Sequence, residues 1–390
     1  MRYRRSPTAI LLLLLAGCRD ATSAPEPPPA PEQLPFVEKL PDPFRRHSGQ
    51  RVRGTAGWPA RRAEISELVQ RHQYGNLPPA PGRVEARTLE ETPGPGGTRR
   101  LIRLSFGPGR RLYLYVGLFR PATRAPVPVI VHIDHRGPFA VPAATVRTIV
   151  ERGYALAGFD PGVLDPDEPR LIGPAQAAYP DRDWATLAVW AWGAMRVADH
   201  LIAQPWVDRT RLIVTGHSRS GKAALLAGAL DTRFALTVPQ GSGCAGAASY
   251  RFQGPRSETL AAITKSFPHW LVPGLARFAG QEGRLPFDQH LVLTLVAPRA
   301  LLTIDALGDL WASPRGTQAS YLGARPVYTF LGAAGRLGIH FRPGAHLLSD
   351  DDWRTLLDFA DRVLLGKQTG RRFDRLPLPV EEVGSWGTPR

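Results

Sequence analysis

Several residue types are scarce in this sequence, and each scarcity excludes a class of protein. Only 2 of the 390 residues are cysteine, which excludes a disulfide framework, and no zinc-ligand or phosphate-loop spacing is present. Lysine occurs only at positions 39, 222, 265 and 367, so arginine supplies nearly all of the 49 basic residues. The arginines are spread along the chain, which is typical of a compositional bias and not of a nucleic-acid-binding surface. The net charge of +15 still favours acidic polysaccharides as partners.

The remaining composition is that of one large folded domain. With 43% hydrophobic and 21% charged residues, the chain has ample material for a core. Strand-like and helix-like segments alternate, which predicts an α/β fold with a mostly parallel sheet and helices on both faces. A loop-rich insertion with short helices is expected at 240–290. We expect helices at 58–75, 143–152, 183–202, 223–230 and 352–365, and strands at 100–106, 111–121, 127–134, 154–160, 212–214, 234–239, 299–305, 327–331 and 338–341.

The stretch 211–222, Arg-Leu-Ile-Val-Thr-Gly-His-Ser-Arg-Ser-Gly-Lys, carries the clearest chemical signal. An apolar strand leads into a tight turn bracketed by Gly216 and Gly221, and a helix follows. A serine at the apex of such a turn is the nucleophile elbow of the α/β-hydrolase fold, a three-layer sandwich. There the first N–H groups of the helix face the carbonyl under attack. Ser218 is therefore the predicted nucleophile, and a glycine-rich turn of a nucleotide-binding fold is the alternative, because short motifs often match by chance.

The partners of a serine nucleophile follow it in this fold in the order acid, then histidine. His346 lies in a Gly-Pro turn after a late strand and is the predicted general base, whereas His340 lies inside the strand pattern and is a weaker candidate. Two aspartates compete for the role of the acid. Asp309 falls in the loop after the 299–305 strand, and Asp305 falls at the end of that strand. A buried carboxylate there would hold the imidazole in the correct tautomer.

The loop after the 127–134 strand is a further candidate part of the site. In α/β-hydrolases this loop often supplies a second N–H to the oxyanion hole. His132, His135 and Arg136 are therefore candidate groups at the rim of the site, although histidines packed beside a strand end would fit the pattern equally well.

The N-terminus is typical of a bacterial lipoprotein. Basic residues at 2, 4 and 5 precede an apolar run at 9–15 that is too short to span a bilayer, and Leu-Ala-Gly-Cys at 15–18 matches a lipobox. We therefore expect Cys18 to be acylated, with a plain signal peptide or a short anchor as the alternative. Arg19, where an aspartate would retain the protein at the inner membrane, favours the outer membrane or cell surface. The expected divisions are a signal peptide at 1–17, a proline-rich tether at 18–35, the catalytic domain at 36–370 and a tail at 371–390.

Six stretches together resemble the bacterial branch of the glucuronoyl esterases, carbohydrate esterase family 15. They match in order and spacing, and the resemblance extends over roughly residues 55–366. They are Gly-His-Ser-Arg-Ser-Gly-Lys at 216–222, Val-Pro-Gln-Gly-Ser-Gly-Cys-Ala-Gly-Ala-Ala at 238–248, Phe-Pro-His-Trp at 267–270, Leu-Pro-Phe-Asp-Gln-His at 285–290, Asp-Leu-Trp-Ala-Ser-Pro-Arg-Gly at 309–316 and Arg-Pro-Gly-Ala-His at 342–346.

The resemblance implies hydrolysis, without a metal or cofactor, of the ester between 4-O-methylglucuronic acid of glucuronoxylan and lignin alcohols. It implies that Ser218 is the nucleophile, that His346 is the base, and that Arg219 stabilises the oxyanion through its N–H and guanidinium. It further implies that the uronic acid is bound by Lys222, which would contact sugar hydroxyls, and by Glu258 and Trp311.

One position departs from the family pattern. Many members carry the acid in the stretch after the sixth strand, where this chain has Gly241. The Asp-x-Trp sequence at 309–311 resembles the bacterial branch and favours Asp309 as the acid. Two other functions stay open: a related esterase acting on another uronate or acetyl ester, and a non-catalytic surface lipoprotein that binds carbohydrate. We expect a monomer attached to the envelope by its lipid alone.

Overall fold

One twisted sheet of nine strands organises the part of the chain that the structure describes. The computed structural model describes residues 29–379, 382–387 and 389, so the predicted lipobox and Cys18 lie outside it. Along the sheet the strand order is β1-β2-β3-β5-β4-β6-β7-β8-β9. The strands are β1 (Glu85–Gly94), β2 (Gly97–Phe106), β3 (Leu112–Pro121), β4 (Val127–Ile133), β5 (Ala155–Phe159), β6 (Val207–His217), β7 (Phe234–Gln240), β8 (Ala300–Ala306) and β9 (Leu337–Arg342).

The sheet is antiparallel at one end and parallel over the rest. β1, β2, β3 and β5 pair antiparallel in that order, and every pairing from β5 to β9 is parallel. Because the carboxyl ends of parallel strands meet along one edge, the loops after β6, β7, β8 and β9 converge there. Those loops hold the candidate site residues. This arrangement is the α/β-hydrolase fold, as the elbow motif predicted.

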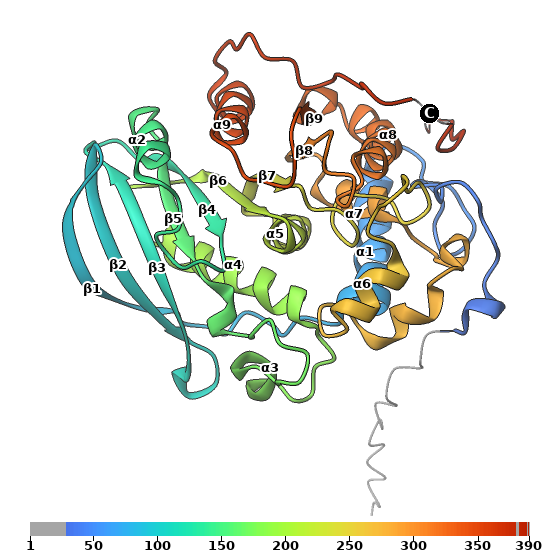
Figure 1. Ribbon diagram of the computed structural model, residues 1–390, viewed down its shortest axis with the longest axis horizontal. Helices are drawn as coiled ribbons and strands as arrows, with labels where there is room; N and C mark the ends of the chain where they lie inside the picture. Colours follow the sequence, from blue (N-terminus) through green and yellow to red (C-terminus); the bar gives the residue numbers. More distant parts are fainter. Residues whose placement is uncertain (1–28, 380–381, 388, 390) are drawn as a thin grey trace, which may run out of the picture.

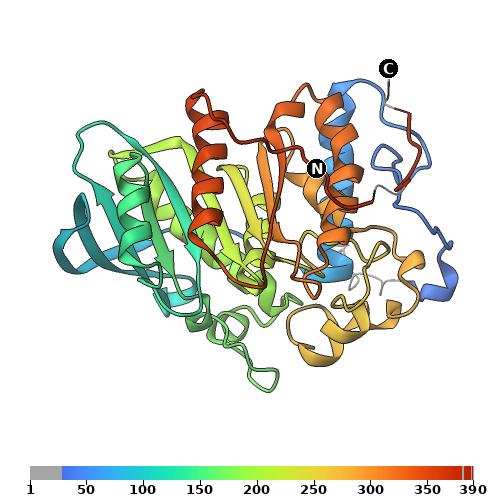
Figure 2. The same cartoon turned by 45° about the horizontal axis from the view of Figure 1, so that its top comes forward.

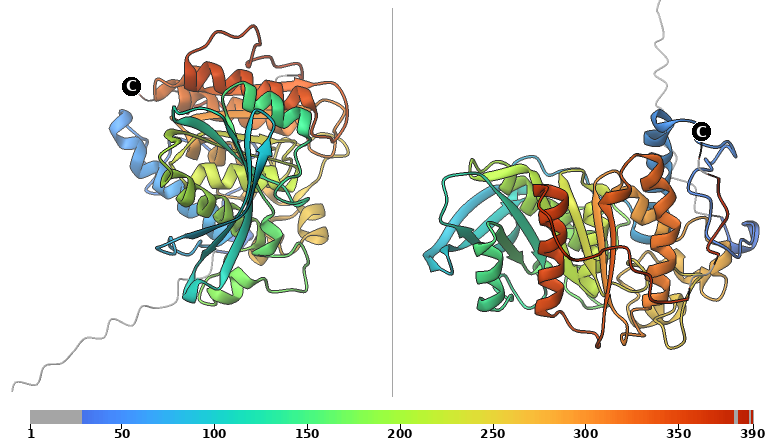
Figure 3. Two further views of the ribbon diagram at one scale, coloured as in Figure 1. Left: turned by 90° about the vertical axis from the view of Figure 1, so that its left-hand side faces the viewer. Right: turned by 90° about the horizontal axis from the view of Figure 1, so that it is seen from above.

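Helices cover both faces of the sheet (Figure 1). α4 and α5 pack on one face, with α7, α1 and α8 beside them, while α2 and α9 pack on the other. Figure 2 shows α2 and α9 side by side on that second face, and Figure 3 shows the helices on both sides of the sheet. The helices are α1 (Trp58–Val69), α2 (Ala143–Glu151), α3 (Pro174–Ala178), α4 (Thr186–Ile202), α5 (Arg219–Leu230), α6 (Leu260–Ser266), α7 (Gln289–Val296), α8 (Pro314–Phe330) and α9 (Asp350–Leu365).

The burial of each strand explains whether it could be predicted from the sequence. Every residue of β4, β5 and β8 is buried, which is why these strands read as continuous apolar runs. β1 was not predicted, because its side chains are exposed along nearly the whole strand and show no apolar alternation. It joins the sheet only through its hydrogen bonds to β2.

The strand predicted at 327–331 is wrong. These residues form the last turn of α8 and its C-cap, Leu331. A short apolar run cannot be assigned to helix or strand by its periodicity alone, and Pro326, directly before this run, is a residue that usually ends a helix. The helix continues through Pro326 because Tyr321, Ala324 and Val327, three residues apart, are buried on one face.

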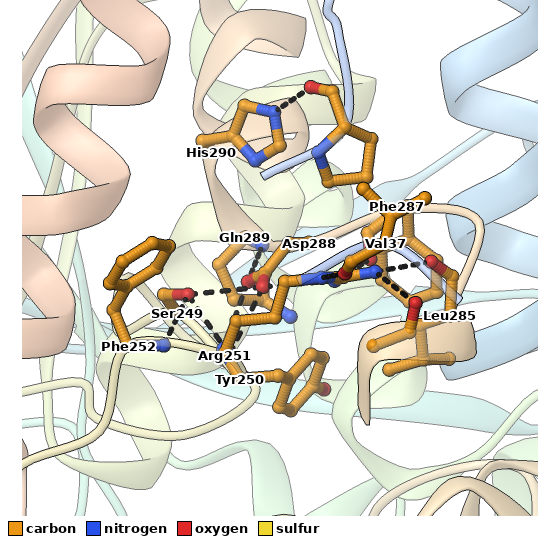
Figure 4. Close-up of polar contacts among 12 residues, drawn as sticks. Val37, Ser249, Tyr250, Arg251, Phe252, Leu285, Phe287, Asp288, Gln289 and His290 are labelled. Carbon is orange, nitrogen blue, oxygen red and sulfur yellow. Dashed lines mark hydrogen bonds and ion pairs between the residues drawn. The ribbon is translucent and has the colours of Figure 1, made fainter. Parts of the chain in front are cut away.

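A buried ion pair anchors the insertion between β7 and α7 (Figure 4). Nη1 of Arg251 lies 3.1 Å from Oδ2 of Asp288, and both side chains are almost fully buried. Asp288 also accepts hydrogen bonds from the Ser249 hydroxyl and the Tyr250 backbone, while Arg251 donates to backbone carbonyls of the same insertion. The guanidinium reaches the N-terminal segment through Val37 as well. The pair therefore fixes the loops that carry one wall of the site.

Described residues after α9 pack against the folded domain. Phe373 is buried and packs edge-on against Phe359 of α9, and Val383 packs with Leu40 of the N-terminal segment. In the described part of the chain, no helix has the length and apolar character needed to cross a membrane.

Candidate active site

Ser218 lies at a strained turn between β6 and α5. Its backbone has φ 58° and ψ −124°, a left-handed conformation that non-glycine residues rarely adopt. The turn requires glycine on both sides. A Cβ at Gly216 would lie 2.5 Å from the carbonyl oxygen of Ser220, and one at Gly221 would lie 2.9 Å from that of Gln240. The strand, turn and helix thus have the geometry of a nucleophile elbow.

His346 and Asp309 meet across two loops. His346 follows β9 and Asp309 follows β8, and the Nδ1 atom of the imidazole contacts Oδ2 of the carboxylate. Gly308 donates to the carbonyl of Gly344 at 3.0 Å, which holds the two loops together. Because the carboxylate occupies Nδ1, the other ring nitrogen is left for Ser218, which lines the same pocket as His346. The chain order of serine, acid and histidine is that of α/β-hydrolases.

The structure distinguishes the two candidate acids. Asp305 is buried on β8 and lines a cavity of about 10 Å³ together with Asp309 and Gly241, whereas it is Asp309 that contacts the imidazole of His346. Burial raises its pKa to about 8, so at neutral pH Asp305 is mostly protonated. His340, the other candidate base, lies on β9 near Asp351 and Arg371. Geometry thus favours the pair of Asp309 and His346.

Gly241 follows β7 and lies close to the imidazole of His346. Its φ is 50°, and a Cβ there would lie 3.6 Å from Cε1 of His346. A carboxylate at this position would therefore be close to the histidine, but this chain has no side chain there. The acid at 309 approaches His346 from the neighbouring loop instead.

A pocket of about 210 Å³ opens beside Ser218; we call it the Ser218 pocket. Lys222 and Glu258 meet in its wall, where Nζ lies 2.9 Å from Oε2 and both side chains are about 5% exposed. The ammonium also donates to the carbonyls of Ser242 and Cys244. The ring of Trp311, 51% exposed, lies at the same pocket. The structure therefore brings together all three residues that the resemblance implied for sugar binding.

Arg219 is held by an aspartate that the sequence analysis missed. Its guanidinium contacts Asp167, in the loop after β5, and lies 5.4 Å from the ring centre of Trp270. Asp167 also accepts hydrogen bonds from Trp270 Nε1 at 2.6 Å and from His269 at 2.8 Å. Burial opposes ionisation of Asp167, but these hydrogen bonds and the charge of Arg219 lower its pKa to about 2. The sequence signals near this contact are the long loop at 161–183, which is rich in proline and aspartate, and the Phe-Pro-His-Trp stretch at 267–270.

The three rim candidates have different positions. His132 is buried and lies 3.2 Å from Asp134, and His135 packs on Trp190, where burial lowers its pKa to about 4. His132 is therefore packed inside, whereas the His135 side chain is 23% exposed and lies half-buried at the strand end. The Arg136 side chain is exposed and bound to Asp134. Its backbone N–H also donates to Asp134, so this N–H is used within its own turn.

Comparison with known proteins gives a consistent result. The family model described as glucuronyl esterase, fungi, matches residues 109–332. Carbohydrate esterase MZ0003, from an unknown prokaryotic organism, is 30% identical over 92% of this chain and 99% of its own length. A carbohydrate esterase family 15 glucuronoyl esterase from Caldicellulosiruptor kristjansonii has a TM-score of 0.78 and 31% identity, covering 90% of this chain and 97% of that one. A mutant glucuronoyl esterase from Sporotrichum thermophile, in complex with methyl 4-O-methyl-β-D-glucopyranuronate, has a TM-score of 0.74 and 26% identity, covering 91% and 96%.

Proposed function

The chain belongs to the glucuronoyl esterase family, and we propose that it cleaves the ester between (4-O-methyl-)glucuronic acid of glucuronoxylan and lignin alcohols through an acyl-enzyme on Ser218. It is a carboxylic ester hydrolase. The observation that carries the proposal is the contact of His346 with Asp309 beside the elbow serine, in a pocket that also holds Lys222, Glu258 and Trp311.

The reaction has two halves. Ser218 Oγ attacks the ester carbonyl while His346 takes its proton, and Asp309 stabilises the imidazolium that forms. The oxyanion is stabilised by the backbone N–H of Arg219 at the start of α5 and by its guanidinium, which Asp167 holds in place. His346 then protonates the leaving alcohol oxygen. Water, deprotonated by His346, attacks the acyl-enzyme and releases the free uronic acid and Ser218.

The Ser218 pocket suits the acid half of the substrate. The three N–H groups of Lys222 already bind Glu258 and two backbone carbonyls, so the ammonium neutralises the Glu258 carboxylate and holds it in the wall as an acceptor for a sugar hydroxyl. Trp311 offers a flat apolar face on which a pyranose ring can pack. The pocket volume of about 210 Å³ is of the order of one monosaccharide.

The proposed reaction is tested by measuring hydrolysis of benzyl glucuronate and of a simple aryl acetate by the purified protein, with Ser218→Ala as the control. We expect strong preference for the glucuronate ester and loss of turnover in the variant. Hydrolysis of the acetate alone would indicate a different carbohydrate ester as substrate. No turnover of either ester would indicate a surface lipoprotein that only binds carbohydrate.

We also propose that the protein is anchored in the bacterial cell envelope through a lipid on Cys18. The basic residues, the short apolar run and the lipobox at 15–18 support this location. Incorporation of labelled palmitate into the wild-type chain in cells, and its loss in Cys18→Ser, would be expected. Equal labelling of the two would contradict the assignment.

A further inference from the structure

A second pocket lies next to the Ser218 pocket, and His346 lines both. Its volume is about 310 Å³, and we call it the Arg136 pocket. The elbow runs between the two, because Ser218 faces the first pocket while His217 and Ser220 face the second. The remaining lining of the Arg136 pocket comes from the end of β4 and from the loop after His346: Ile133, Asp134, Arg136, Leu347 and Leu348.

The chemistry of ester cleavage requires a place for the alcohol beside His346. The imidazole that takes the proton of Ser218 must deliver it to the oxygen of the leaving alcohol, so that oxygen lies within hydrogen-bond reach of the ring. If the uronic acid occupies the Ser218 pocket, the alcohol extends from the ester in another direction around the imidazole. The Arg136 pocket is a cavity of the described residues that borders the imidazole outside the Ser218 pocket.

The lining of this pocket suits an aromatic group. Leu347 is 67% exposed although it is apolar, so it offers a surface that a ligand could cover. Arg136 is held in one plane by Asp134, with Nε 2.9 Å from Oδ1 and Nη2 2.6 Å from Oδ2. A planar, fixed guanidinium with an exposed face stacks well on an aromatic ring. Burial lowers the pKa of His217 to about 4, so this ring adds no charge to the pocket at neutral pH.

We propose that the Arg136 pocket binds the alcohol half of the ester and selects arylalkyl alcohols, with the ring between Arg136 and Leu347. This inference rests on the proposed function, because it assigns the second half of the same substrate. A methyl ester reaches little of the lining, whereas a benzyl or phenylpropanoid ester covers the exposed apolar surface of Leu347.

Two esters of one acid test the assignment. The ratio of kcat/KM for benzyl glucuronate to that for methyl glucuronate is measured in the wild type, in Leu347→Ala and in Arg136→Ala. We expect Leu347→Ala to lower kcat/KM for the benzyl ester about four- to tenfold, since each methylene group withdrawn from an apolar contact is worth about fourfold, and to lower kcat/KM for the methyl ester less, so that the ratio falls. Arg136→Ala should act in the same direction.

Leu89→Ala is the matched control, because Leu89 is also an exposed leucine, 41% exposed, but lies on β1 at the far end of the sheet. It should leave the ratio unchanged. Trapping of the acyl-enzyme by added benzyl alcohol, compared with methanol, should fall in Leu347→Ala for benzyl alcohol only. An unchanged ratio in both pocket variants, with both esters still cleaved, would overturn the assignment. Failure of the wild type to cleave either ester would instead overturn the proposed function.

Discussion

The replacement Asp309→Asn tests the candidate triad most directly. Asparagine has nearly the size of aspartate, so a side chain that is 4% exposed can be exchanged without leaving a cavity. What the exchange removes is the negative charge beside Nδ1 of His346. We expect kcat to fall by about a thousandfold, while KM changes little because Asp309 does not face the sugar-binding wall.

The size of the effect follows from the geometry. Two unit charges about 4 Å apart interact by about 4 kcal/mol at an effective dielectric constant of about 20. That energy, lost from the imidazolium in the transition state, corresponds to about a thousandfold in rate. Neighbouring groups do not compensate, because Asp305 is mostly protonated at neutral pH, with its pKa raised to about 8 by burial, and Gly241 has no side chain.

Initial rates on benzyl glucuronate measure kcat and KM separately. Asp305→Asn is the control, because it removes the other candidate acid and should keep kcat within about threefold of wild type. Urea unfolding checks that both variants are folded. If Asp309→Asn kept kcat within about tenfold of wild type, or if Asp305→Asn lost a thousandfold, the assignment of the acid would be refuted.

Three further outcomes are expected. Burial raises the pKa of Asp305 to about 8, whereas the unfolded chain releases this proton near pH 4. The free energy of unfolding should therefore be highest below pH 4 and fall by about 5 kcal/mol as the pH rises to 8. Urea titrations at both pH values should show that Asp305→Asn removes this loss. Asp288→Asn removes the ion-pair partner of the buried Arg251 guanidinium and should lower the free energy of unfolding by about 3 to 5 kcal/mol. Asp374→Asn, which breaks an exposed ion pair, is the control and should lower it by less than about 1 kcal/mol. Equal losses in urea unfolding would contradict the role of the Arg251–Asp288 pair as an anchor of the insertion. Asp167→Asn removes the carboxylate that holds the Arg219 guanidinium, so steady-state kinetics should show kcat lowered about tenfold with a smaller change in KM. An unchanged kcat would mean that the guanidinium does not need Asp167 to stabilise the oxyanion.

Local patterns explain how much of the fold was predictable. Parallel strands buried on both faces appear in the sequence as apolar runs, so β4, β5, β7 and β8 were located to within one residue at each end. Of β6, only the buried centre at 212–214 was predicted, because its first half is polar and partly exposed. The same local criterion failed at 327–331, where a five-residue apolar run belongs to a helix. It also missed β1, whose pairing with β2 leaves no trace of burial in its side chains.

The elbow at Ser218 and the loop histidine at 346 were determined by the sequence itself, because glycine spacing and turn residues act on the backbone within a few positions. Which of the two aspartates contacts His346 was decided only by tertiary structure. Asp305 and Asp309 lie four residues apart, and their side chains differ in role because one points into the buried edge of β8 and the other reaches a loop 37 positions away. The contact of Asp167 with Arg219 and the pocket on the second side of His346 were decided in the same way. Such contacts join loops that follow different strands, and the sheet order that brings those loops together depends on the packing of the whole chain.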